Sequence, residues 1–579
     1  MRHLYRLIAI VSFAICSACS DYKDSETTTY HVQAKAHLGE VVRTTIIDDV
    51  EARSAKVLWD AADQIGVAAT TSSTISTLEL TAGAGNSSAS FEGDITINNP
   101  EVENYFAFYP ALSSATLSNG QLTLTLPTEQ QNVASGVDGA TCGFMIAKSN
   151  NASIDKLSFT FENLFAILRL PLTGNGEQLA QISFAGGKNE ITSGAFTIDL
   201  TSPEYDITFN ENGSRHTSLL TDVTLTATPT VFYLVVPAIE YTSGYSIRVT
   251  TTDGQTMFRS VGRDGGRSLE RGSIYKLPDL NFESQRTDLS LNGRANCYIV
   301  SASGNYCFDS NLPDGATAEI VWQDSDGLIS NVELTSDGYV CFTAGSNEGN
   351  ALLAVRNASN TIIGSWHIWA TDAPQSQTYD DGTVVLDRNL GALSPDGAGL
   401  YYQWGRPTPF TATPQTTETD DLASATNNPA LFYTEWASLN VPNDSWGNPS
   451  DDSSSYSSAQ GTKTANDPCP AGWRVAPPTL YRTIGKLLDK TTTTCYTITF
   501  DNGTKAYYPF TDRLTASGTL SGSSGGYLWT NSNYISQSSK TLNGTYFQYS
   551  KNNTSSFAGS GSKISSSKTY GQNVRCVAE

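Results

Sequence analysis

The dominant pattern along the chain is alternation of apolar and polar residues with a period of two. The segments 121–126 (QLTLTL) and 246–250 (SIRVT) alternate in this way, which predicts strands with one buried face. The continuous apolar run 231–236 (VFYLVV) ends at a proline and predicts a strand buried on both faces, and 166–170 (AILRL) predicts another strand. Only 477–490 instead places its leucines and isoleucine on one stripe of an amphipathic helix, with a strand as the alternative. Because glycine and asparagine turn signals recur about every eight to twelve residues, we expect a mainly β fold built from sandwiches.

Changes in pattern divide the chain into four units after a leader. The expected units are a β-sandwich at 19–150, a second β-sandwich at 151–283, a small β-module at 284–374 and a C-terminal domain at 375–579 rich in Trp, Gly and Ser. A chain of 579 residues is long enough for about three to five domains.

Composition and charge narrow the function. Acidic residues (57) outnumber basic ones (35), and the net charge of −22 argues against nucleic acid as a partner, because such a body repels phosphates. The five histidines form no HExxH motif, and no pair of CxxC motifs is present, so a zinc or histidine-based hydrolase is poorly supported. We therefore expect no enzymatic activity, no cofactor and no metal site.

Residues 1–18 are predicted to be a lipoprotein signal peptide. Two arginines precede the apolar run 7–15, which as a helix spans only about 14 Å, too short for a bilayer core of about 30 Å. The following ICSAC at 15–19 resembles a bacterial lipobox, which implies cleavage before Cys19 and its acylation; an ordinary secretory cleavage is the alternative. We expect a surface-exposed lipoprotein held to the outer membrane by lipid.

Nine cysteines are present and two belong to the lipobox segment, so seven remain and at least one thiol must be free. Export permits disulfides. Cys307 and Cys341 lie on strand-like segments and form one candidate bridge, and Cys469 with Cys576 forms a second. Buried free thiols are the alternative.

The N-terminal half resembles the fimbrillin family of Mfa-like pilin lipoproteins, over roughly residues 30–280. The matching segments are 58–67 (LWDAADQIGV), 105–110 (YFAFYP), 157–170, 191–196 (ITSGAF) and the strand that ends at Val236-Pro237. This resemblance implies two transthyretin-like β-sandwiches and a role in building or decorating pili.

The resemblance also implies assembly with other fimbrillin subunits by donor-strand exchange. In that scheme an arginine-specific protease removes an N-terminal strand, and the opened groove accepts a strand from another subunit by β-augmentation. The run 41–47 (VVRTTII) is the expected removable strand. Arg53 is the candidate processing site and Arg43 the runner-up; a surface arginine in an uncut, anchored chain is the alternative.

The C-terminal part resembles a different module, the major-paralogous (FISUMP-type) domain. The matching blocks are 385–392 (VLDRNLGA), 399–406 (GLYYQWGR), 467–475 (DPCPAGWRV) and 573–577 (NVRCV). The module is loosely similar to C-type lectins and sulfatase-modifying factors, so we expect an α+β, C-type-lectin-like domain there.

Two features of this domain bear on ligand binding. Trp404, Trp446, Trp473 and Trp529 are candidates for a sugar-stacking platform, although tryptophans serve more often as core. Asp387 and Arg388 are adjacent in the sequence, and we expect them to form a structural ion pair rather than a catalytic acid–base site.

Two classes of function compete. The favoured one is a tip or accessory pilus subunit with an adhesive C-terminal domain, because a last strand paired inside its own domain cannot be donated. The alternative is a lipid-anchored surface protein that binds a host or bacterial glycan, or a protein ligand, and does not polymerise.

Overall fold

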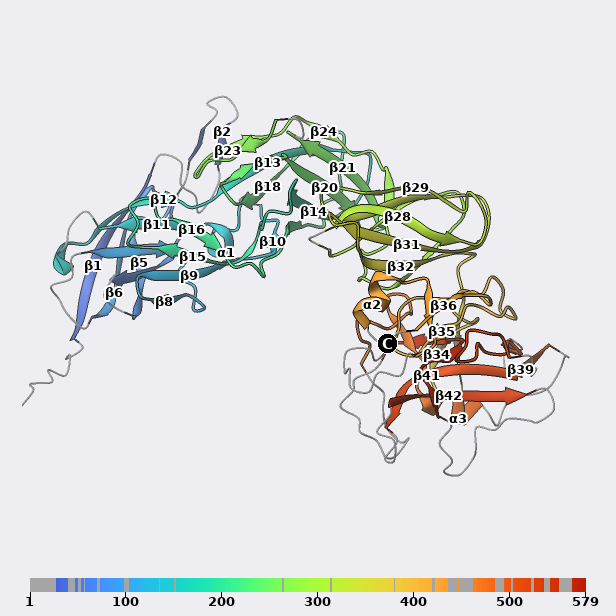
Figure 1. The fold of residues 1–579 in the computed structure, drawn as a ribbon. Helices are drawn as coiled ribbons and strands as arrows, with labels where there is room; N and C mark the ends of the chain where they lie inside the picture. The colour runs from blue at the N-terminus through green and yellow to red at the C-terminus, as the bar shows by residue number, and fades with distance from the viewer. Residues whose placement is uncertain are drawn as a thin grey trace, which may run out of the picture.

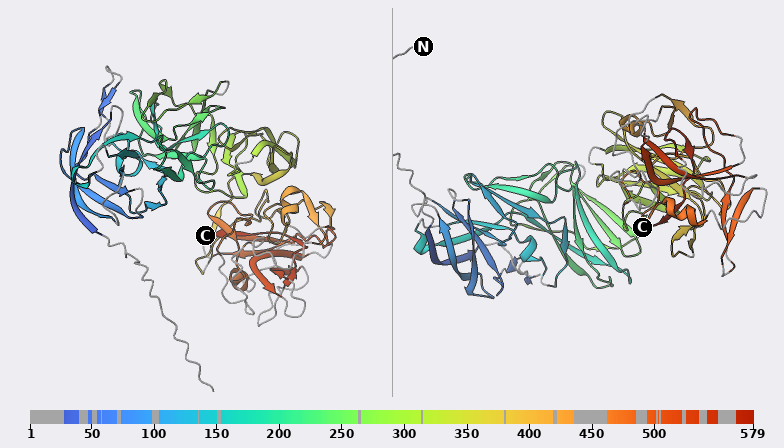
Figure 2. Two further views of the ribbon diagram at one scale, coloured as in Figure 1. Left: turned by 60° about the vertical axis from the view of Figure 1, so that its left-hand side comes forward. Right: turned by 90° about the horizontal axis from the view of Figure 1, so that it is seen from below.

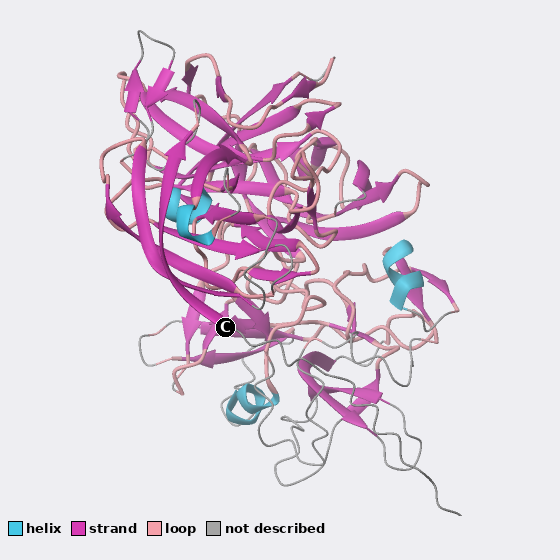
Figure 3. Cartoon of the chain, turned by 90° about the vertical axis from the view of Figure 1, so that its left-hand side faces the viewer, coloured by secondary structure: helices cyan, strands magenta, loops and turns pink. Residues whose placement is uncertain are grey.

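Strands dominate the computed structural model, so the mainly β fold class is confirmed (Figure 3). The units follow one another along a bent path from β1 to the C-terminal domain (Figures 1 and 2). The structure describes residues 28–39, 47–49, 54–56, 58–69, 73–97, 104–134, 136–149, 153–262, 265–312, 315–379, 381–418, 422–435, 446, 462–484, 494–500, 503, 505–521, 525–535, 542–550 and 565–579.

The first unit is a closed barrel with the strand order β1-β12-β11-β7-β4-β5-β6. Its strands are β1 (Thr28–Leu38), β4 (Gln64–Ala69), β5 (Ile75–Ala82), β6 (Ser88–Ile97), β7 (Tyr105–Tyr109), β11 (Met145–Lys148) and β12 (Ser158–Asn163). Trp59 lies in the core, and its ring makes edge-on contacts with Phe91, Tyr109 and Phe161 at centroid distances of 5.0–5.7 Å. The Tyr109 hydroxyl donates a hydrogen bond of 2.7 Å to Asp63, so the 58–67 motif is a core-forming motif of the barrel.

The expected boundary at residue 150 is wrong, because strands from both sides of it share sheets. After the 3₁₀ turn η1 (Ile154–Lys156), β12 returns to the barrel, where it pairs with β1 and β11. In the other direction, β8 and β9 join β15 and β16 in a sheet of order β16-β15-β9-β8 beside the barrel. The strands of this sheet are β8 (Thr116–Ser118), β9 (Gln121–Leu126), β15 (Gly194–Asp199) and β16 (Ile207–Phe209). The short helix α1 (Gly139–Cys142) precedes β11 in the chain.

The second unit is centred on a sheet with both faces buried, as the apolar runs predicted. Its order is β18-β13-β23, with β24 also paired to β13. On β18, Leu234 packs into the core shared with the nine-stranded sheet, whereas Val235 packs into the core shared with β9 and β15. The strands are β13 (Ala166–Thr173), β18 (Thr230–Val236), β23 (Ile274–Lys276) and β24 (Leu280–Asn281), and the short pair β19 (Glu240–Tyr241) and β22 (Arg267–Ser268) lies off this sheet.

A nine-stranded sheet runs through the second unit and into the third, in the order β10-β17-β14-β20-β21-β25-β27-β30-β29. These strands are β10 (Glu129–Gln131), β14 (Leu179–Gly186), β17 (His216–Leu220), β20 (Tyr245–Thr251), β21 (Gln255–Val261), β25 (Arg286–Asp288), β27 (Asn305–Asp309), β29 (Ile329–Leu334) and β30 (Tyr339–Ala344). In the third module its end faces a second sheet, built from β26 (Cys297–Val300), β28 (Gly315–Gln323), β31 (Gly349–Asn357) and β32 (Ile362–Ala370). The two units are therefore joined by main-chain hydrogen bonds across the sheet.

A buried ion pair strengthens this joint. Arg248 on β20 donates two hydrogen bonds, of 2.8 and 3.0 Å, to Asp337 of the third module. Its guanidinium also lies 3.8 Å from the centre of the Tyr339 ring. Both charged side chains are almost completely buried, at 1% and 4% exposure.

The C-terminal domain is an assembly of short sheets with two short helices. Its main sheet has the order β33-β34-β45-β38, and a second sheet has the order β41-β42-β43. The bounds are β33 (Ser376–Thr378), β34 (Val384–Leu386), β38 (Trp473–Val475), β45 (Cys576–Ala578), β41 (Gly525–Ile535), β42 (Leu542–Ser550), β43 (Ser565–Ser567), α2 (Leu422–Asn427) and α3 (Pro478–Ile484). Two-stranded pairs are formed by β35 (Tyr402–Gln403) with β44 (Gly571–Gln572), β36 (Gln415–Thr417) with β37 (Leu431–Tyr433), and β39 (Cys495–Thr499) with β40 (Lys505–Pro509). The predicted helix is thus confirmed up to Ile484, and 485–490 lies outside the described residues.

Candidate functional site

The strand β1 closes the barrel by lying between two others. It pairs antiparallel with β6 from Thr28 to His37 and parallel with β12 from Lys35 to Leu38. Alternate side chains point into the core, where Val32, Ala34 and Ala36 are all buried. Removal of this strand would leave β6 and β12 as two open edges.

The expected removable strand, 41–47, lies almost entirely outside the described residues. Of the run 41–47 only Ile47 is described, and it pairs with Lys56 in a separate hairpin of β2 (Ile47–Asp49) and β3 (Ser54–Lys56). The N-terminal strand that closes the barrel is β1, whose inner half alternates buried and exposed residues.

The other N-terminal predictions lie outside the described residues. These are the signal peptide 1–18, the lipidation site Cys19, and the two arginines Arg43 and Arg53. Arg53 directly precedes β3, between the two strands of the β2–β3 hairpin in sequence.

The C-terminal strand is enclosed by its own domain. β45 lies between β34 and β38 in the main sheet, and Cys576 on this strand forms a disulfide with Cys469. The neighbouring Arg575 is buried, and its guanidinium donates two hydrogen bonds, of 2.9 and 3.1 Å, to Asn389. The end of the chain is therefore fixed covalently and by a buried polar network.

Charged residues of the C-terminal motifs also have structural partners. Arg388 forms the expected ion pair with Asp387, at 2.9 Å, and a second one with Asp372, at 2.6 Å. Asp467 accepts main-chain hydrogen bonds from Cys469 and Val475, and burial raises the pKa of its carboxyl to about 6. These groups hold the domain together and do not converge on an open site.

The structure contradicts the proposed tryptophan platform. Trp404, Trp446 and Trp529 are completely buried, and each donates its indole N–H to a main-chain carbonyl at 2.7–3.1 Å. Their large apolar area is used to fill the core. Trp473 is half-buried, so it could not form a platform with the other three.

The expected bridge between Cys307 and Cys341 is likewise wrong, because both residues are free thiols. They lie directly opposite each other on β27 and β30. The Cys307 sulfur instead contacts the Arg248 guanidinium at 3.5 Å, and a hydrogen bond with Cys341 together with burial raises the pKa of Cys307. The thiol pair is part of the joint between the second and third units.

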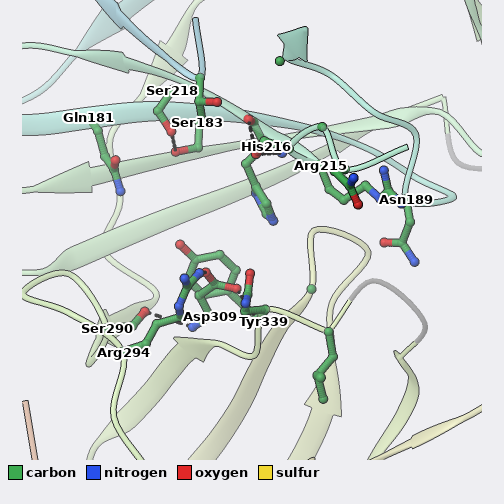
Figure 4. A pocket seen from close by; sticks show the side chains of 18 of the residues that line it. Gln181, Ser183, Asn189, Arg215, His216, Ser218, Ser290, Arg294, Asp309 and Tyr339 are labelled. Carbon is green, nitrogen blue, oxygen red and sulfur yellow. Dashed lines mark hydrogen bonds and ion pairs between the residues drawn. The ribbon is translucent and has the colours of Figure 1, made fainter. Parts of the chain in front are cut away.

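A polar cleft of about 1160 Å³ lies where these two units meet. One wall is the outer face of β14 and β17 in the nine-stranded sheet, where Gln181 and Ser183 on β14 lie beside His216 and Ser218 on β17 (Figure 4). Alternate residues of the same strands face the core, so the period-two pattern places a polar face on the cleft. Ser183 and Ser218 are cross-strand partners, and their hydroxyls are 2.8 Å apart.

The opposite wall comes from the third module. It includes Ser290, Arg294, Asp309 and Tyr339, which face the strand residues across the open space (Figure 4). Arg294 forms an ion pair with Asp309 at 3.1 Å, and Ser290 donates a hydrogen bond of 2.6 Å to Asp288. This wall is therefore held in place by its own polar contacts.

Two charged groups on the cleft retain unused hydrogen-bonding capacity. The Nε and Nη1 atoms of Arg215 are buried and have no hydrogen-bond partner among the described residues. The same holds for Oδ2 of Asp288, whose side chain is buried and whose pKa is raised, mainly by that burial. A buried donor or acceptor without a partner costs about 1–3 kcal/mol of stability. Because these atoms are closed off from the surface, a ligand in the cleft would not reach them without a shift of the side chains.

Sequence reasoning missed this cleft. Its residues are separated widely along the chain, and the SRHTS segment at 214–218 is ordinary polar sequence at a strand start. Within the described ranges no group of three or more His, Cys, Asp or Glu side chains is arranged to hold a metal ion. No helix in the described part of the chain is long and apolar enough to cross a membrane.

Comparison with known proteins finds a family likeness in the N-terminal half. Residues 47–282 match the model of the fimbrillin-like family, a region that runs from β2 to the end of the second unit. This region is therefore fimbrillin-like in sequence. The match does not extend to β1, the third module or the C-terminal domain, and no curated protein sequence matches the chain.

Among the solved structures with detectable likeness to this chain, three are described as a cell adhesion protein or as fimbrial proteins. A proposed cell adhesion protein from Bacteroides ovatus is 16% identical over 44% of this chain and 93% of its own, with a TM-score of 0.30. The tip fimbrial protein Mfa3 from Porphyromonas gingivalis is 12% identical over 43% of this chain and 96% of its own, with a TM-score of 0.24. A fimbrial protein from Bacteroides ovatus is 12% identical over 94% of this chain and 98% of its own, with a TM-score of 0.20.

Proposed function

We propose that this protein is a non-enzymatic fimbrial subunit of the cell surface, with a role in adhesion. It is exported as a lipoprotein, acylated at Cys19 and held at the outer membrane. Cleavage at Arg53 then releases β1, and a strand from another fimbrillin subunit takes its place. The observation that carries this proposal is the position of β1, which fills a gap between two strands of the barrel.

The side chains of β1 make it suitable for exchange. Of its fully inward residues, Ala34 and Ala36 bury little apolar surface, so much of the attachment comes from main-chain hydrogen bonds to β6 and β12. Main-chain pairing is the common basis of strand addition, and alternate side chains supply the specificity. An incoming strand therefore needs small apolar residues at alternate positions.

The enclosed C-terminal strand supports a terminal place in the fibre. Since β45 is paired on both sides and linked through Cys576 to Cys469, it is unavailable for donation to a neighbour. The protein can accept a strand but cannot pass one on from this end, which suits a tip or accessory subunit. Immunogold labelling should then mark fibre ends, and label along the whole shaft would contradict the terminal position.

A reversible lock on β1 tests the exchange. Lys35 and Ser90 are cross-strand partners, and the N–H of Lys35 is directed to Leu157 on the other side, so the two residues form a close pair without mutual hydrogen bonds. We expect Lys35→Cys with Ser90→Cys to form a disulfide that retains β1. After arginine-specific cleavage, the reduced variant should bind a labelled peptide of sequence 28–38, and the oxidised variant should not.

Two controls make this result interpretable. Wild-type protein under the same oxidising and reducing conditions accounts for effects on the native disulfide, and Arg53→Ala and Arg43→Ala show which arginine is cut. N-terminal sequencing of the cut protein should begin at Ser54. Equal peptide binding by the locked and reduced forms would reject exchange at β1 and favour the unpolymerised, lipid-anchored alternative.

A further inference from the structure

We propose that the groove left by β1 selects an incoming strand with a positively charged side chain at the outward position that His31 now occupies. This inference rests on the proposed strand exchange and adds the chemistry of the partner. The donor is a segment in which a cationic residue is followed by small residues three and five positions later, as His31 is followed by Ala34 and Ala36. The observation that carries it is the contact of His31 with two carboxylates of β6, those of Glu92 and Asp94.

The outward side chains of β1 and β6 face each other in register. Directly opposite residues on one face of an antiparallel pair are close enough for their side chains to interact. The Thr29 hydroxyl lies 3.1 Å from that of Thr96, and Nδ1 of His37 lies 2.9 Å from the Ser88 hydroxyl. β6 therefore presents a row of polar groups that contacts the outward residues of whichever strand lies in this place.

Acidic side chains surround the position opposite His31. His31 is the register partner of Asp94, and its Nδ1 lies 2.8 Å from that carboxylate. Its Nε2 lies 3.0 Å from Glu92, the next outward residue of β6, and Glu92 is in turn opposite Glu79 on β5. Departure of β1 would leave these three acidic side chains together without the His31 ring. Because like charges on neighbouring strands repel, a strand that brings a cation to this point is favoured.

The charged groups of the other elements packed against β1 lie towards its far end. Pairing with β12 begins only at Lys35, four residues after His31, and Glu162 of β12 lies beyond the last pair. The turn η1, which carries Asp155 and Lys156, ends just before the residue whose carbonyl accepts the Lys35 N–H. The charge preference at position 31 is therefore set by β6 and its neighbour β5.

A lysine or arginine fits this position better than the resident histidine at neutral pH. Hydrogen bonds with Asp94 and Glu92 raise the pKa of His31 above 6.5, so the attraction is complete below pH 6.5 and is lost as the pH rises through the raised pKa. A lysine keeps its charge throughout this range. The resident strand is therefore held less firmly above the pKa of His31, where a donor with lysine still pairs with both carboxylates.

The test is a competition on the full chain after arginine-specific cleavage. A labelled peptide of sequence 28–38 is bound to the cut protein and displaced by unlabelled peptides of the same sequence, either unchanged or with His31→Lys, His31→Gln or His31→Glu. At pH 8 and low salt, we expect the His31→Lys peptide to bind about tenfold more tightly than the His31→Glu peptide, because repulsion replaces attraction. High salt should reduce this ratio. At pH 5.5 the advantage of His31→Lys over the unchanged peptide should shrink, since the histidine is then charged.

His37 provides the matched control in the peptide. It is a histidine on the same face of the same strand, but its ring contacts the Ser88 hydroxyl instead of a carboxylate. Peptides with His37→Lys and His37→Glu should differ little, and their ratio measures the general effect of an acidic chain. In the protein, Asp94→Asn with Glu92→Gln keeps the shapes of both side chains, and it should lower the ratio at position 31 to that at position 37.

The outcomes separate this inference from strand exchange itself. Binding that decreases from His31→Lys through His31→Gln to His31→Glu, and that loses this order in the Asp94→Asn, Glu92→Gln protein, supports selection by charge. Equal displacement by all four peptides would leave strand exchange standing and overturn the inference. An order that persists in the protein without the two carboxylates would overturn it as well. If no peptide of the set binds, strand exchange at β1 is rejected and this inference is rejected with it.

Discussion

Removal of the Asp337 carboxylate should destabilise the joint between the second unit and the third module. In Asp337→Ala the Arg248 guanidinium would remain buried, at 1% exposure, without the two hydrogen bonds that now pair its charge. Burial alone would lower the pKa of Arg248, but the Asp337 carboxylate raises it above its usual range, so this partner stabilises the buried charge. Loss of one partner of a buried ion pair costs about 3–5 kcal/mol, and we expect a decrease of that size in the free energy of unfolding.

An exposed ion pair within the third module provides the comparison. Glu333, at 55% side-chain exposure, pairs with Arg286, and Glu333→Ala should cost no more than about 1 kcal/mol because water screens the interaction. Urea denaturation gives both free energies, and hydrogen exchange in 339–344 reports on the joint itself. Equal effects of the two variants would refute the reasoning.

The apolar replacement of the pair separates charge burial from general damage. Arg248→Met combined with Asp337→Leu removes both charges, and replacing a buried ion pair in this way is often neutral or stabilising. We therefore expect the double variant to recover most of the stability that Asp337→Ala loses. A double variant as unstable as the single one would show that packing, rather than the unpaired charge, causes the loss.

Three further predictions concern the third module and the C-terminal domain. Cys469→Ser should lower the unfolding free energy of the C-terminal domain by about 2–5 kcal/mol, since the bond with Cys576 closes a long loop; calorimetry checks this, and an unchanged melting temperature would count against it. Burial lowers the pKa of His367 from 6.5 to about 3, so its contribution to stability is complete above pH 6.5 and is lost as the pH falls. Between pH 8 and pH 5 the wild type should therefore lose about 2 kcal/mol of unfolding free energy from this group. Denaturation of His367→Gln at the same pH values should lack that loss. Trp529→Ala should cost about 3–5 kcal/mol, whereas Trp473→Ala should cost clearly less because Trp473 is half-buried; equal losses in urea denaturation would contradict the assignment of Trp529 to the core.

Local patterns predicted the parts of the fold that depend on neighbouring residues. The alternation at 121–126 corresponds to β9, and the apolar run at 231–236 corresponds to β18, which is buried on both faces. The spacing of Leu480 and Ile484 corresponds to α3. In each case the side-chain period follows directly from the geometry of a strand or helix.

Contacts between distant segments were harder to predict. The place of β1 in the barrel depends on how its small residues fit between β6 and β12, and apolarity along the chain does not contain that information. Whether a tryptophan such as Trp404 is core or surface depends on what surrounds it, and composition does not contain that information.

The cleft could not be predicted for the same reason. Arg215 and Asp288 are 73 positions apart, and only the path of the nine-stranded sheet brings them to one opening. Their missing partners are a property of the folded surroundings, which no local motif records.

The sheet that continues from the second unit into the third has a mechanical consequence. Because neighbouring strands of this sheet are hydrogen-bonded to each other, both sides of the cleft share one continuous support. The cleft therefore cannot open by a hinge motion between the two units. A pulling force applied between the barrel and the C-terminal domain would be transmitted through this sheet, and the width of the cleft would stay the same.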